Sequence, residues 1–517
     1  MFPSLGLDSS TWALVLFCVL FSAVAVKRRR NVSRLPLPPG PAKWPLVGNL
    51  FQIPTGRQWD KYIEWSGQFN SDIIHLDAAG TSIVVISSME TVKDLFEKRS
   101  SLYSDRPRAV MLAELMGWDF GLGDRWRANR RLFHETFSVG AGKQFYPQER
   151  AAAHELLRRM LQDPQRDIMA QFRHMAGALI LDVTYGIKVL STDDPWIKLA
   201  KEVMHAFSIA IIPGAFMVDT IPALKYVPDW MPGAGFQRKA KQWRKISLDL
   251  LEKPFAETKR QIEMGTAPAS FTSLNLGASD DSVNTTQPER EETVKTSAAN
   301  MYSGGADTTV SALGTFALAM LANPEAQKMA QAEIDSVVGV GHLPDFADQV
   351  DLPYVSALLK EVLRWSNVAP IAIPHYLGIE DEYKGYRIPA GSVVIGNVWA
   401  LMHDETVYPE PNSFKPERFL LDGKLNPAIR DPETVVFGFG RRACPGLHLA
   451  TASLWITMAS ILSAFNISKA LDDDGNEIEP SYEYEPALIF SPLPFKCTVT
   501  PRSPQATQAI QSTIVGM

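Results

Sequence analysis

The chain has 517 residues, of which 46% are hydrophobic, so it holds enough apolar material for one large domain or a few smaller ones. Its 51 basic and 57 acidic side chains leave a net charge of −6, which excludes the strongly basic composition of a typical nucleic-acid-binding protein. Three cysteines are too few for a disulfide framework, and this usage is typical of a reducing compartment such as the cytosol.

The first forty residues predict a membrane anchor followed by a stiff spacer. Residues 11–26, TWALVLFCVLFSAVAV, carry no charge and span roughly 24 Å as a helix, slightly less than a hydrocarbon core. Asp8 precedes this run and the basic residues 27–30 follow it, so the positive-inside rule places the rest of the chain in the cytosol. We therefore divide the chain into an anchor at 1–26, a basic and proline-rich hinge at 27–41 and one domain at 42–517.

A cleaved signal peptide is the alternative interpretation of the same segment, since Ala23-Val24-Ala25 resembles a cleavage site. It is the weaker interpretation, because no positive region precedes the apolar run and the basic cluster lies on the far side of it. An uncleaved anchor predicts a single-pass membrane protein with a cytosolic body.

Helical periodicity dominates the body of the chain. We expect helices at 289–322, 352–365 and 447–465, and short strands at 73–87, 386–388 and 393–397. Small polar residues at 265–288 predict a long surface loop, and the tail after Pro501 is expected to be weakly ordered. These elements predict a mostly α domain with a minor β region.

Cys444 lies in the glycine-rich stretch FGFGRRACPG, at 437–446, directly before an apolar helix. Glycines permit positive φ angles and a close approach of the backbone to a large group. The start of a helix favours a thiolate. A zinc site is disfavoured because only His448 lies nearby. A catalytic Cys–His pair, a buried structural cysteine and an axial ligand of a flat macrocycle all remain open.

KEVLRW places Glu361 and Arg364 on one face of a helix. Arg418, in FKPERF, is able to join them in a carboxylate–guanidinium cluster. The alternative is a surface ion pair of little energetic consequence.

Two further patterns contain polar side chains within a predicted helix. SGGADTT, at 303–309, weakens the helix and offers the carboxylate of Asp307 and the hydroxyl of Thr308 for proton delivery; the alternative is a kinked core helix. DRWRANRR places Trp126 and Arg130 one turn apart, where both are able to donate hydrogen bonds to an anion; the alternative is a solvated basic face.

Together, in this order, the four patterns resemble the cytochrome P-450 superfamily of haem-thiolate monooxygenases, from the anchor to roughly Pro501. FGFGRRACPG fits the family's F-x-x-G-x-R-x-C-x-G pattern at every fixed position, and E-x-x-R, PERF and W-x-x-x-R are also present. The resemblance implies haem b with Cys444 as the thiolate ligand of the iron. The other haem-binding residues that it implies are Phe437, Gly440, Gly446, Arg442, Trp126, Arg130 and, in IPHY, His375.

The resemblance also implies roles for the remaining residues. Asp307 and Thr308 are expected to deliver protons while dioxygen is activated. Glu361, Arg364 and Arg418 are expected to brace the loop that carries Cys444. Because the chain has no flavin-binding segment, electrons are expected from a separate NADPH-dependent reductase, which would meet the basic residues Arg127, Arg131 and Arg441.

The implied architecture is the P-450 fold behind one N-terminal transmembrane helix, in the endoplasmic reticulum membrane with the catalytic domain in the cytosol. The segments that line the substrate pocket in this family are apolar here, which predicts a small hydrophobic substrate. The pocket residues that we expect are Met116, Phe120, Phe207, Ile211, Gly304, Ile371 and Leu488. The apolar stretch 209–236 and the basic stretch 237–245 have two interpretations, contact with the membrane or a core segment beside a solvated helix face.

The general style resembles fungal microsomal enzymes of secondary metabolism. Hydroxylation of a terpenoid is the first hypothesis for the reaction, and oxidation of an indole or polyketide intermediate is the second. A haem-thiolate isomerase or dehydratase that does not use dioxygen is disfavoured, because Asp307 and Thr308 supply the acid and the alcohol that oxygen activation needs. A haem sensor or electron carrier is disfavoured by the long apolar substrate segments.

Overall fold

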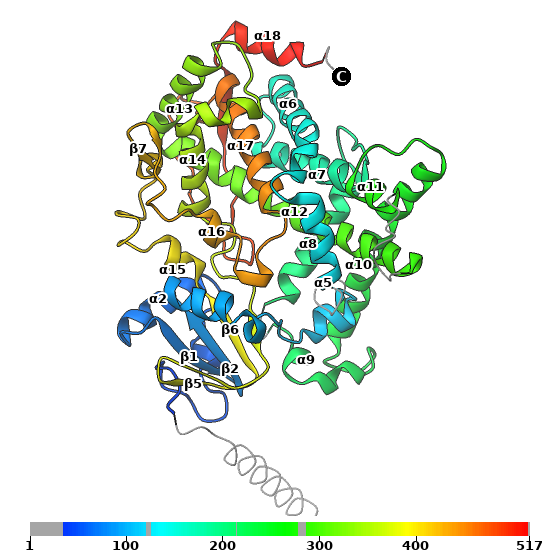
Figure 1. The fold of residues 1–517 in the computed structure, drawn as a ribbon, viewed down its shortest axis with the longest axis vertical. Helices are drawn as coiled ribbons and strands as arrows, with labels where there is room; N and C mark the ends of the chain where they lie inside the picture. The colour runs from blue at the N-terminus through cyan, green and yellow to red at the C-terminus, as the bar shows by residue number, and fades with distance from the viewer. Residues whose placement is uncertain (1–34, 120–125, 213–214, 278–285, 515–517) are drawn as a thin grey trace, which may run out of the picture.

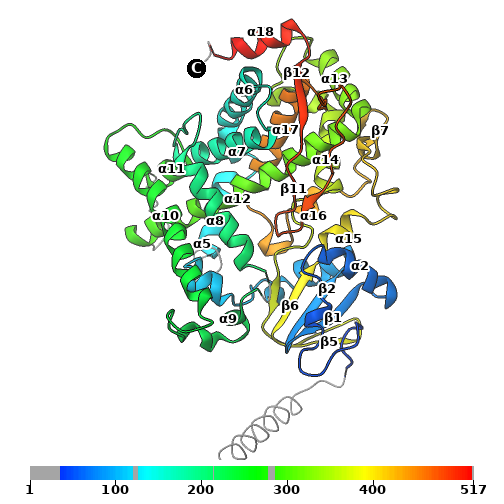
Figure 2. The ribbon, with the colours of Figure 1, turned by 180° about the vertical axis from the view of Figure 1, so that it is seen from behind.

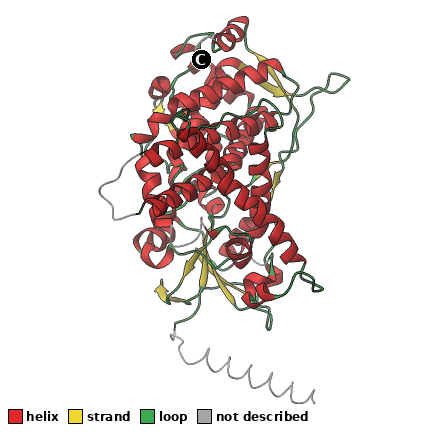
Figure 3. Ribbon diagram, turned by 90° about the vertical axis from the view of Figure 1, so that its right-hand side faces the viewer, coloured by secondary structure: helices red, strands yellow, loops and turns green. Residues whose placement is uncertain are grey.

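The computed structural model describes residues 35–119, 126–212, 215–277 and 286–514. The predicted anchor at 11–26 and the predicted pocket residue Phe120 lie outside this part of the chain. Helices form most of the fold and short strands form a smaller part of it (Figure 3), which confirms the prediction of a mostly α fold with a minor β region.

The helical segments fall into three groups: long α-helices, short α-helices, and segments with a tighter or wider helical turn. The long helices are α2 (Gln58–Gln68), α5 (Trp126–Phe137), α6 (Tyr146–Gln162), α7 (Ile168–Tyr185), α8 (Pro195–Ala210), α10 (Gly235–Glu263), α12 (Gln287–Ala322), α13 (Pro324–Val337), α14 (Pro353–Trp365), α17 (Leu447–Ala464) and α18 (Pro504–Ser512). The short helices are α3 (Met89–Val92), α4 (Ser100–Tyr103), α9 (Met217–Thr220), α11 (Phe271–Gly277), α15 (Val398–Met402) and α16 (Glu433–Val436). Single tight or wide turns form η1 (Leu50–Gln52), η2 (Lys93–Lys98), η3 (Val110–Leu115), η5 (Ala141–Phe145), η6 (Pro222–Tyr226), η7 (Phe346–Asp351), η8 (Pro416–Phe419) and η9 (Gly440–Arg442).

A four-stranded sheet lies at one end of the molecule, beside α2 and α15 (Figure 1). Its order is β1 (Ile73–Ala78), β2 (Thr81–Ile86), β6 (Ser392–Gly396) and β3 (His375–Leu377), with β2 and β6 parallel and the other pairs antiparallel. Alternate residues of β1 enter different cores: Ile73 packs with Phe96, whereas Ile74 packs with Trp65 of α2. Both faces of the sheet are therefore covered, which explains the continuous apolar runs in these strands.

The remaining strands form two-stranded pairs at the edges of the helical body. The pairs are β4 (Asp381–Tyr383) with β5 (Tyr386–Ile388), β7 (Leu420–Leu421) with β8 (Lys424–Leu425), β9 (Phe465–Lys469) with β12 (Cys497–Pro501), and β10 (Tyr484–Glu485) with β11 (Ser491–Pro492). The described part of the predicted hinge lies against the sheet end of the molecule, since the backbone N–H groups of His75 and Arg387 donate to the carbonyls of Pro39 and Pro36 at 2.9 and 2.8 Å.

Helix α12 crosses the middle of the molecule (Figures 1 and 2) and is continuous through the glycine-containing segment 303–309. A capping box of Thr286 and Glu289 begins the helix. A Cβ atom on Gly305 would lie 2.6 Å from Ile180 Cδ1, so glycine permits close packing of α7 here and no kink follows from it. Among the described helices, α12 and α17 are long and apolar enough to cross a membrane, but both are largely buried and act as core helices.

Two expectations about loops are wrong. The expected loop at 265–288 contains α11, which forms because Phe271 is fully buried and stacks on Phe133 and Phe137. The tail after Pro501 forms α18, which Ser503 caps and which buries Ile510 completely. In both cases a few apolar side chains dock on the larger body, and neither segment is long enough to show a periodic pattern.

Candidate functional site

The loop at 437–446 folds back on itself before α17 begins. The backbone N–H of Cys444 donates to the carbonyl of Phe437 at 2.6 Å. Gly438 and Gly440 have φ angles of +78° and +54°, which favour glycine, and a Cβ atom on Gly440 would lie 2.1 Å from the carbonyl oxygen of Phe96. At Gly440 the glycine is therefore required by the turn and by η2, and the large group that it approaches is the protein's own backbone.

The thiol of Cys444 faces open space although protein surrounds it. The residue is exposed, and burial nevertheless raises the pKa of its thiol, against the opposing effects of a hydrogen bond from the Gly446 N–H and the charge of Arg130. The residue is therefore surrounded by protein and still has free space beside it. The N–H donor and the nearby guanidinium are groups that stabilise a thiolate.

Helix α12 also faces open space, at Gly304. This glycine is exposed within a mostly buried stretch of helix, and a Cβ atom there would meet nothing within 4 Å. One turn later, the hydroxyl of Thr308 donates to the carbonyl of Gly304 at 2.7 Å. The hydroxyl therefore lies beside an unfilled volume, where a small molecule is able to reach it.

Among the described residues, several guanidinium groups share one region near Cys444. The Arg442 guanidinium lies 3.9 Å from the ring centroid of Trp126, and its Nε donates to the Ser104 carbonyl at 2.7 Å. Arg130 donates to the carbonyl of Ala443. The motif residues Trp126, Arg130 and Arg442 are thus together on the chain segments that surround Cys444.

Arg106 belongs to the same cluster, and the sequence patterns missed it because it lies in none of them. It donates to the carbonyl of Pro374 at 2.9 Å, and burial together with the charge of Arg442 lowers its pKa to about 9. Burial also lowers the pKa of Arg442; Asp105 opposes this effect, and Arg130 and Arg127 add to it. Buried guanidinium groups that repel one another favour the binding of an anion between them.

His375 lies in the same cluster. Its Nδ1 is 2.5 Å from the carbonyl oxygen of Tyr103, and its ring stacks on Phe96 at 4.1 Å between centroids. Burial lowers the pKa of His375 to about 3, with further lowering by Arg106 and Arg442. Because the cations contribute to this shift, an anion bound among them would raise the pKa again.

Glu361, Arg364 and Arg418 form the cluster that their motifs predict. Glu361 and Arg364 are fully buried and share two hydrogen bonds, of 2.7 and 2.8 Å, while Arg418 Nε lies 3.1 Å from Glu361 Oε1. Beyond Glu361, the two arginines donate hydrogen bonds to backbone carbonyls at 402–413. The cluster therefore fixes the segment 402–413 directly. It acts on the Cys444 loop, at 437–446, only through the chain between these two segments.

Asp307 and Thr308 are neighbours in sequence but have different partners. The Asp307 carboxylate lies 4.0 Å from Arg173 Nε on α7. Burial raises its pKa, and Arg173 and Lys201 oppose this shift. The acid therefore points towards α7 and α8, whereas the alcohol bonds within α12. Arg173, whose buried Nε has no hydrogen-bond partner among the described atoms, is a second residue that no sequence pattern indicated.

The predicted pocket residues have different environments. Met116 is fully buried in the core, and Phe207 and Ile211 of the same cluster are partly buried. Ile371 packs on the sheet core, and Leu488 is half-buried. Ile373, two residues after Ile371, is 41% exposed.

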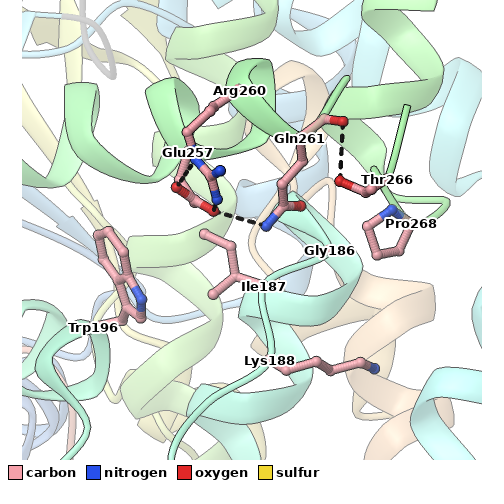
Figure 4. Close-up of a pocket in the computed structure, with 9 residues that line it drawn as sticks. All are labelled: Gly186, Ile187, Lys188, Trp196, Glu257, Arg260, Gln261, Thr266 and Pro268. Carbon is pink, nitrogen blue, oxygen red and sulfur yellow. Dashed lines mark hydrogen bonds and ion pairs between the residues drawn. The ribbon is translucent and has the colours of Figure 1, made fainter. Parts of the chain in front are cut away.

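A separate pocket of about 450 Å³ lies between the ends of α7, α8 and α10 (Figure 4). It contains none of the predicted site residues. Its Glu257 carboxylate accepts hydrogen bonds from Arg260 and Gln261, so these charged groups already satisfy one another. We assign no function to this pocket.

The residues around Cys444 fit a haem group with an axial thiolate. Free space lies beside the thiol, α12 leaves space at Gly304, and the cluster of Arg106, Arg130 and Arg442, which among the described residues Asp105 opposes, is able to hold two propionates. When haem is bound, Cys444 would be its metal ligand and the cluster would hold its propionates.

Comparison with known proteins agrees with this geometry. The family described as cytochrome P-450 matches residues 38–499. A cytochrome P-450 monooxygenase of Postia placenta is 46% identical over 510 residues, which cover 97% of this chain and 96% of the relative. A cytochrome P-450 monooxygenase of Armillaria gallica is 42% identical over 98% and 99% of the two chains, and tryptamine 4-monooxygenase of Psilocybe cyanescens is 39% identical over 96% and 99%. The chain therefore belongs to the cytochrome P-450 family of monooxygenases, an oxidoreductase class.

Proposed function

We propose that this protein is a membrane-anchored monooxygenase of fungal secondary metabolism, which hydroxylates a small, neutral, hydrophobic metabolite. Its cofactor is haem b, its co-substrate is dioxygen, and its electrons come from an NADPH-dependent reductase. The observation that carries the proposal is the exposed Cys444, which lies beside the cationic cluster of Arg106, Arg130 and Arg442.

The residues of the site have two roles, binding of haem and delivery of protons. Bound haem supplies the redox chemistry that activates dioxygen. Arg106, Arg130 and Arg442 orient the group through its propionates. Thr308 holds a proton on Oγ1 beside the open space at Gly304. Asp307 has a pKa raised by burial, so it takes up a proton more readily than an exposed carboxyl, on the side of α12 that faces Arg173 of α7.

A neutral substrate is favoured by the state of the acidic residues near the pocket segments. Glu114 pairs with Arg108 and Lys225, each at 2.7 Å, and Asp219 Oδ1 accepts from the N–H of Met111 at 2.9 Å. These carboxylates already have partners, so binding a substrate ammonium group would require breaking existing contacts. A terpenoid is therefore our first substrate class.

An indole is the second substrate class, since the name of one relative specifies tryptamine. A polyketide intermediate is the third, and the apolar pocket segments accept it equally well.

The proposed location is the endoplasmic reticulum membrane, with residues 11–26 as a single span and the catalytic domain in the cytosol. Exposed apolar residues follow α9: Tyr226 and Trp230 are 78% and 77% exposed. Helix α9 and the beginning of the described chain, at Leu35, lie at the same end of the molecule (Figures 1 and 2), so one membrane would meet both. Arg127, Arg131 and Arg441 are exposed and form our candidate contact for an acidic surface of the reductase.

The test is coexpression with a reductase, followed by a screen of terpenoid, indole and polyketide candidates for substrate-induced spin shifts and oxygenated products. Cys444→His is expected to abolish the red-shifted Soret band of the ferrous carbon monoxide complex, because that band requires an axial thiolate. Cys497→Ser is the matched control, since Cys497 is the other free cysteine of the described chain and is half-buried. An unchanged band in Cys444→His would overturn the ligand assignment.

A further inference from the structure

Helix α2 begins beside a cluster of three aromatic rings. Helices α2 and α15 lie side by side (Figures 1 and 2) and contribute Trp59 and Trp399, whose ring centroids are 6.0 Å apart. Phe490, directly before β11, meets both rings nearly at right angles, with its centroid 5.0 Å from Trp59 and 5.7 Å from Trp399. Three segments that are far apart in sequence therefore meet in this aromatic cluster of Trp59, Trp399 and Phe490.

The guanidinium group of Arg57 lies against all three rings of the aromatic cluster. Its Cζ atom is 5.7 Å from the ring centroid of Trp59, 5.6 Å from that of Trp399 and 5.9 Å from that of Phe490. These distances are within the reach of cation–π attraction. Trp59 and Phe490 are almost fully buried, whereas the side chain of Arg57 is 52% exposed. The cation therefore covers the solvent side of the cluster.

Both the side chain and the backbone of Arg57 are held in place. Asp60 Oδ2 accepts a hydrogen bond from Arg57 Nε at 2.6 Å. The backbone of Arg57 has a φ of +46°, in the left-handed region that residues other than glycine adopt only when their surroundings enforce it. On the preceding residue, Gly56, a Cβ atom would lie 3.2 Å from Pro486 Cγ. The chain that carries Arg57 therefore packs directly on the turn at 486–490.

Backbone hydrogen bonds join the aromatic cluster to the segment 368–373 and to α12. The N–H of Phe490 donates to the carbonyl of Val368, and the N–H of Trp399 donates to the carbonyl of Pro370, both at 2.8 Å. The hydroxyl of Ser311 on α12 donates to the carbonyl of Phe490 at 2.7 Å. A displacement of the rings would therefore move the backbone on which these bonds depend.

Two of the joined segments carry residues that we expect to line the substrate pocket, Ile371 in 368–373 and Leu488 in 486–490. A cation–π contact at a partly exposed position is modest in strength, so it biases the position of such segments without deciding whether the protein folds. We propose that Arg57 is a positioning residue for substrate specificity, which holds the aromatic cluster and thereby sets how these two segments shape the substrate space. The proposal rests on the proposed function only in that the free space beside Cys444 holds haem and substrate.

The first test uses Arg57→Met in the full-length, haem-loaded protein, with phenyldiazene as the probe. After treatment with phenyldiazene and an oxidant, the ratio of the N-phenylporphyrin regioisomers reports the free space above each pyrrole ring, so the natural substrate need not be known. Arg57→Met is expected to change this ratio by about two- to fivefold, the range that loss of a partly exposed cation–π contact allows. Arg57→Lys keeps a cation beside the rings and is expected to stay closer to the wild-type ratio.

Lys61→Met is the matched control, because Lys61 of the same helix lies 5.5 Å from the ring centroid of Trp65, which is not part of the aromatic cluster. It is expected to leave the ratio unchanged. The proposal is overturned if Arg57→Met keeps the wild-type ratio, if Lys61→Met changes it equally, or if Arg57→Lys departs from it as far as Arg57→Met does. A lower denaturation midpoint of Arg57→Met with an unaltered ratio would show a structural role alone and would also overturn it.

Hydrogen–deuterium exchange supplies a second readout, which does not depend on haem chemistry. The N–H groups of Phe490 and Trp399 are expected to exchange faster in Arg57→Met than in the wild type or in Lys61→Met, because their hydrogen bonds to 368–373 lose support. Equal exchange in all three proteins would contradict the proposal. A wild-type protein that yields no N-phenylporphyrin counts against the haem site instead, and the exchange measurement then still decides on the role of Arg57.

Discussion

Replacement of Glu361 by alanine tests whether the buried charge cluster holds the haem side of the molecule together. Glu361 and Arg364 are both 0% exposed, and Arg418 is 8% exposed in its side chain. Removing the carboxylate leaves Arg364 as a buried charge without its anion, and it also removes the acceptor for the backbone N–H of Lys415. Breaking a buried pair in this way costs about 3–5 kcal/mol, a large share of the roughly 5–15 kcal/mol by which a folded domain is stable.

The assay is urea denaturation combined with the haem content of the purified protein. We expect Glu361→Ala to lower the free energy of unfolding by about 4 kcal/mol and to reduce haem retention, because the 402–413 segment loses its clamp. Glu361→Gln is a milder second variant in case the alanine variant does not fold. It keeps the volume of the side chain and removes the charge.

Glu64→Ala is the matched control, since Glu64 and Lys61 also form a pair three residues apart on a helix, with side chains 61% and 34% exposed. It is expected to leave the denaturation midpoint and haem content unchanged, because exposed pairs contribute little. Our reasoning is refuted if Glu361→Ala costs less than about 1 kcal/mol, or if it matches the control, since a buried charge cannot be stranded without a penalty.

Three other predictions concern proton delivery, the Cys444 loop and pH. Thr308→Ala is expected to uncouple NADPH consumption from product and to increase hydrogen peroxide release, and tight coupling in a peroxide assay would argue against its role. Gly440→Ala is expected to destabilise by at least about 2 kcal/mol in urea, because alanine strains the positive φ and its Cβ would meet the Phe96 carbonyl; a neutral change would contradict this. Burial lowers the pKa of His403 to about 4, so between about pH 6.5 and 4 the imidazole is protonated in the unfolded chain but not in the folded chain. The free energy of unfolding therefore decreases as the pH falls, by up to about 1.4 kcal/mol per pH unit. His403→Gln is expected to reduce this slope in denaturation between pH 6.5 and 4, and an unaltered slope would exclude the histidine as its source.

The long elements could be predicted from local pattern. The expected helices at 289–322, 352–365 and 447–465 lie within two residues of α12, α14 and α17, because a long run of helix-forming residues shows its own pattern. Helices α11 and α18 could not be predicted. Each depends on one or two side chains, Phe271 and Ile510, whose burial comes from partners far away in sequence.

The residues of the candidate site also fall into those that a short motif indicates and those that it does not. Cys444, Glu361 and Arg364 are marked by short motifs, because a helix turn or a tight loop places their side chains within a few residues. No short motif of the sequence contains Arg106 or Arg173. Their contacts, with Pro374 and with Asp307, join segments more than a hundred residues apart.

The sequence by itself determined which chemistry this protein is built for: a single thiolate on a glycine-rich turn, an acid beside an alcohol in a long helix, and a carboxylate three residues before an arginine. Local geometry is enough for these features, since each is set within one turn of chain. Only the tertiary structure decided that free space lies beside the thiol and that arginines from distant segments lie together near it. Charge repulsion and open space arise between segments that pack together after folding, so no local pattern contains them.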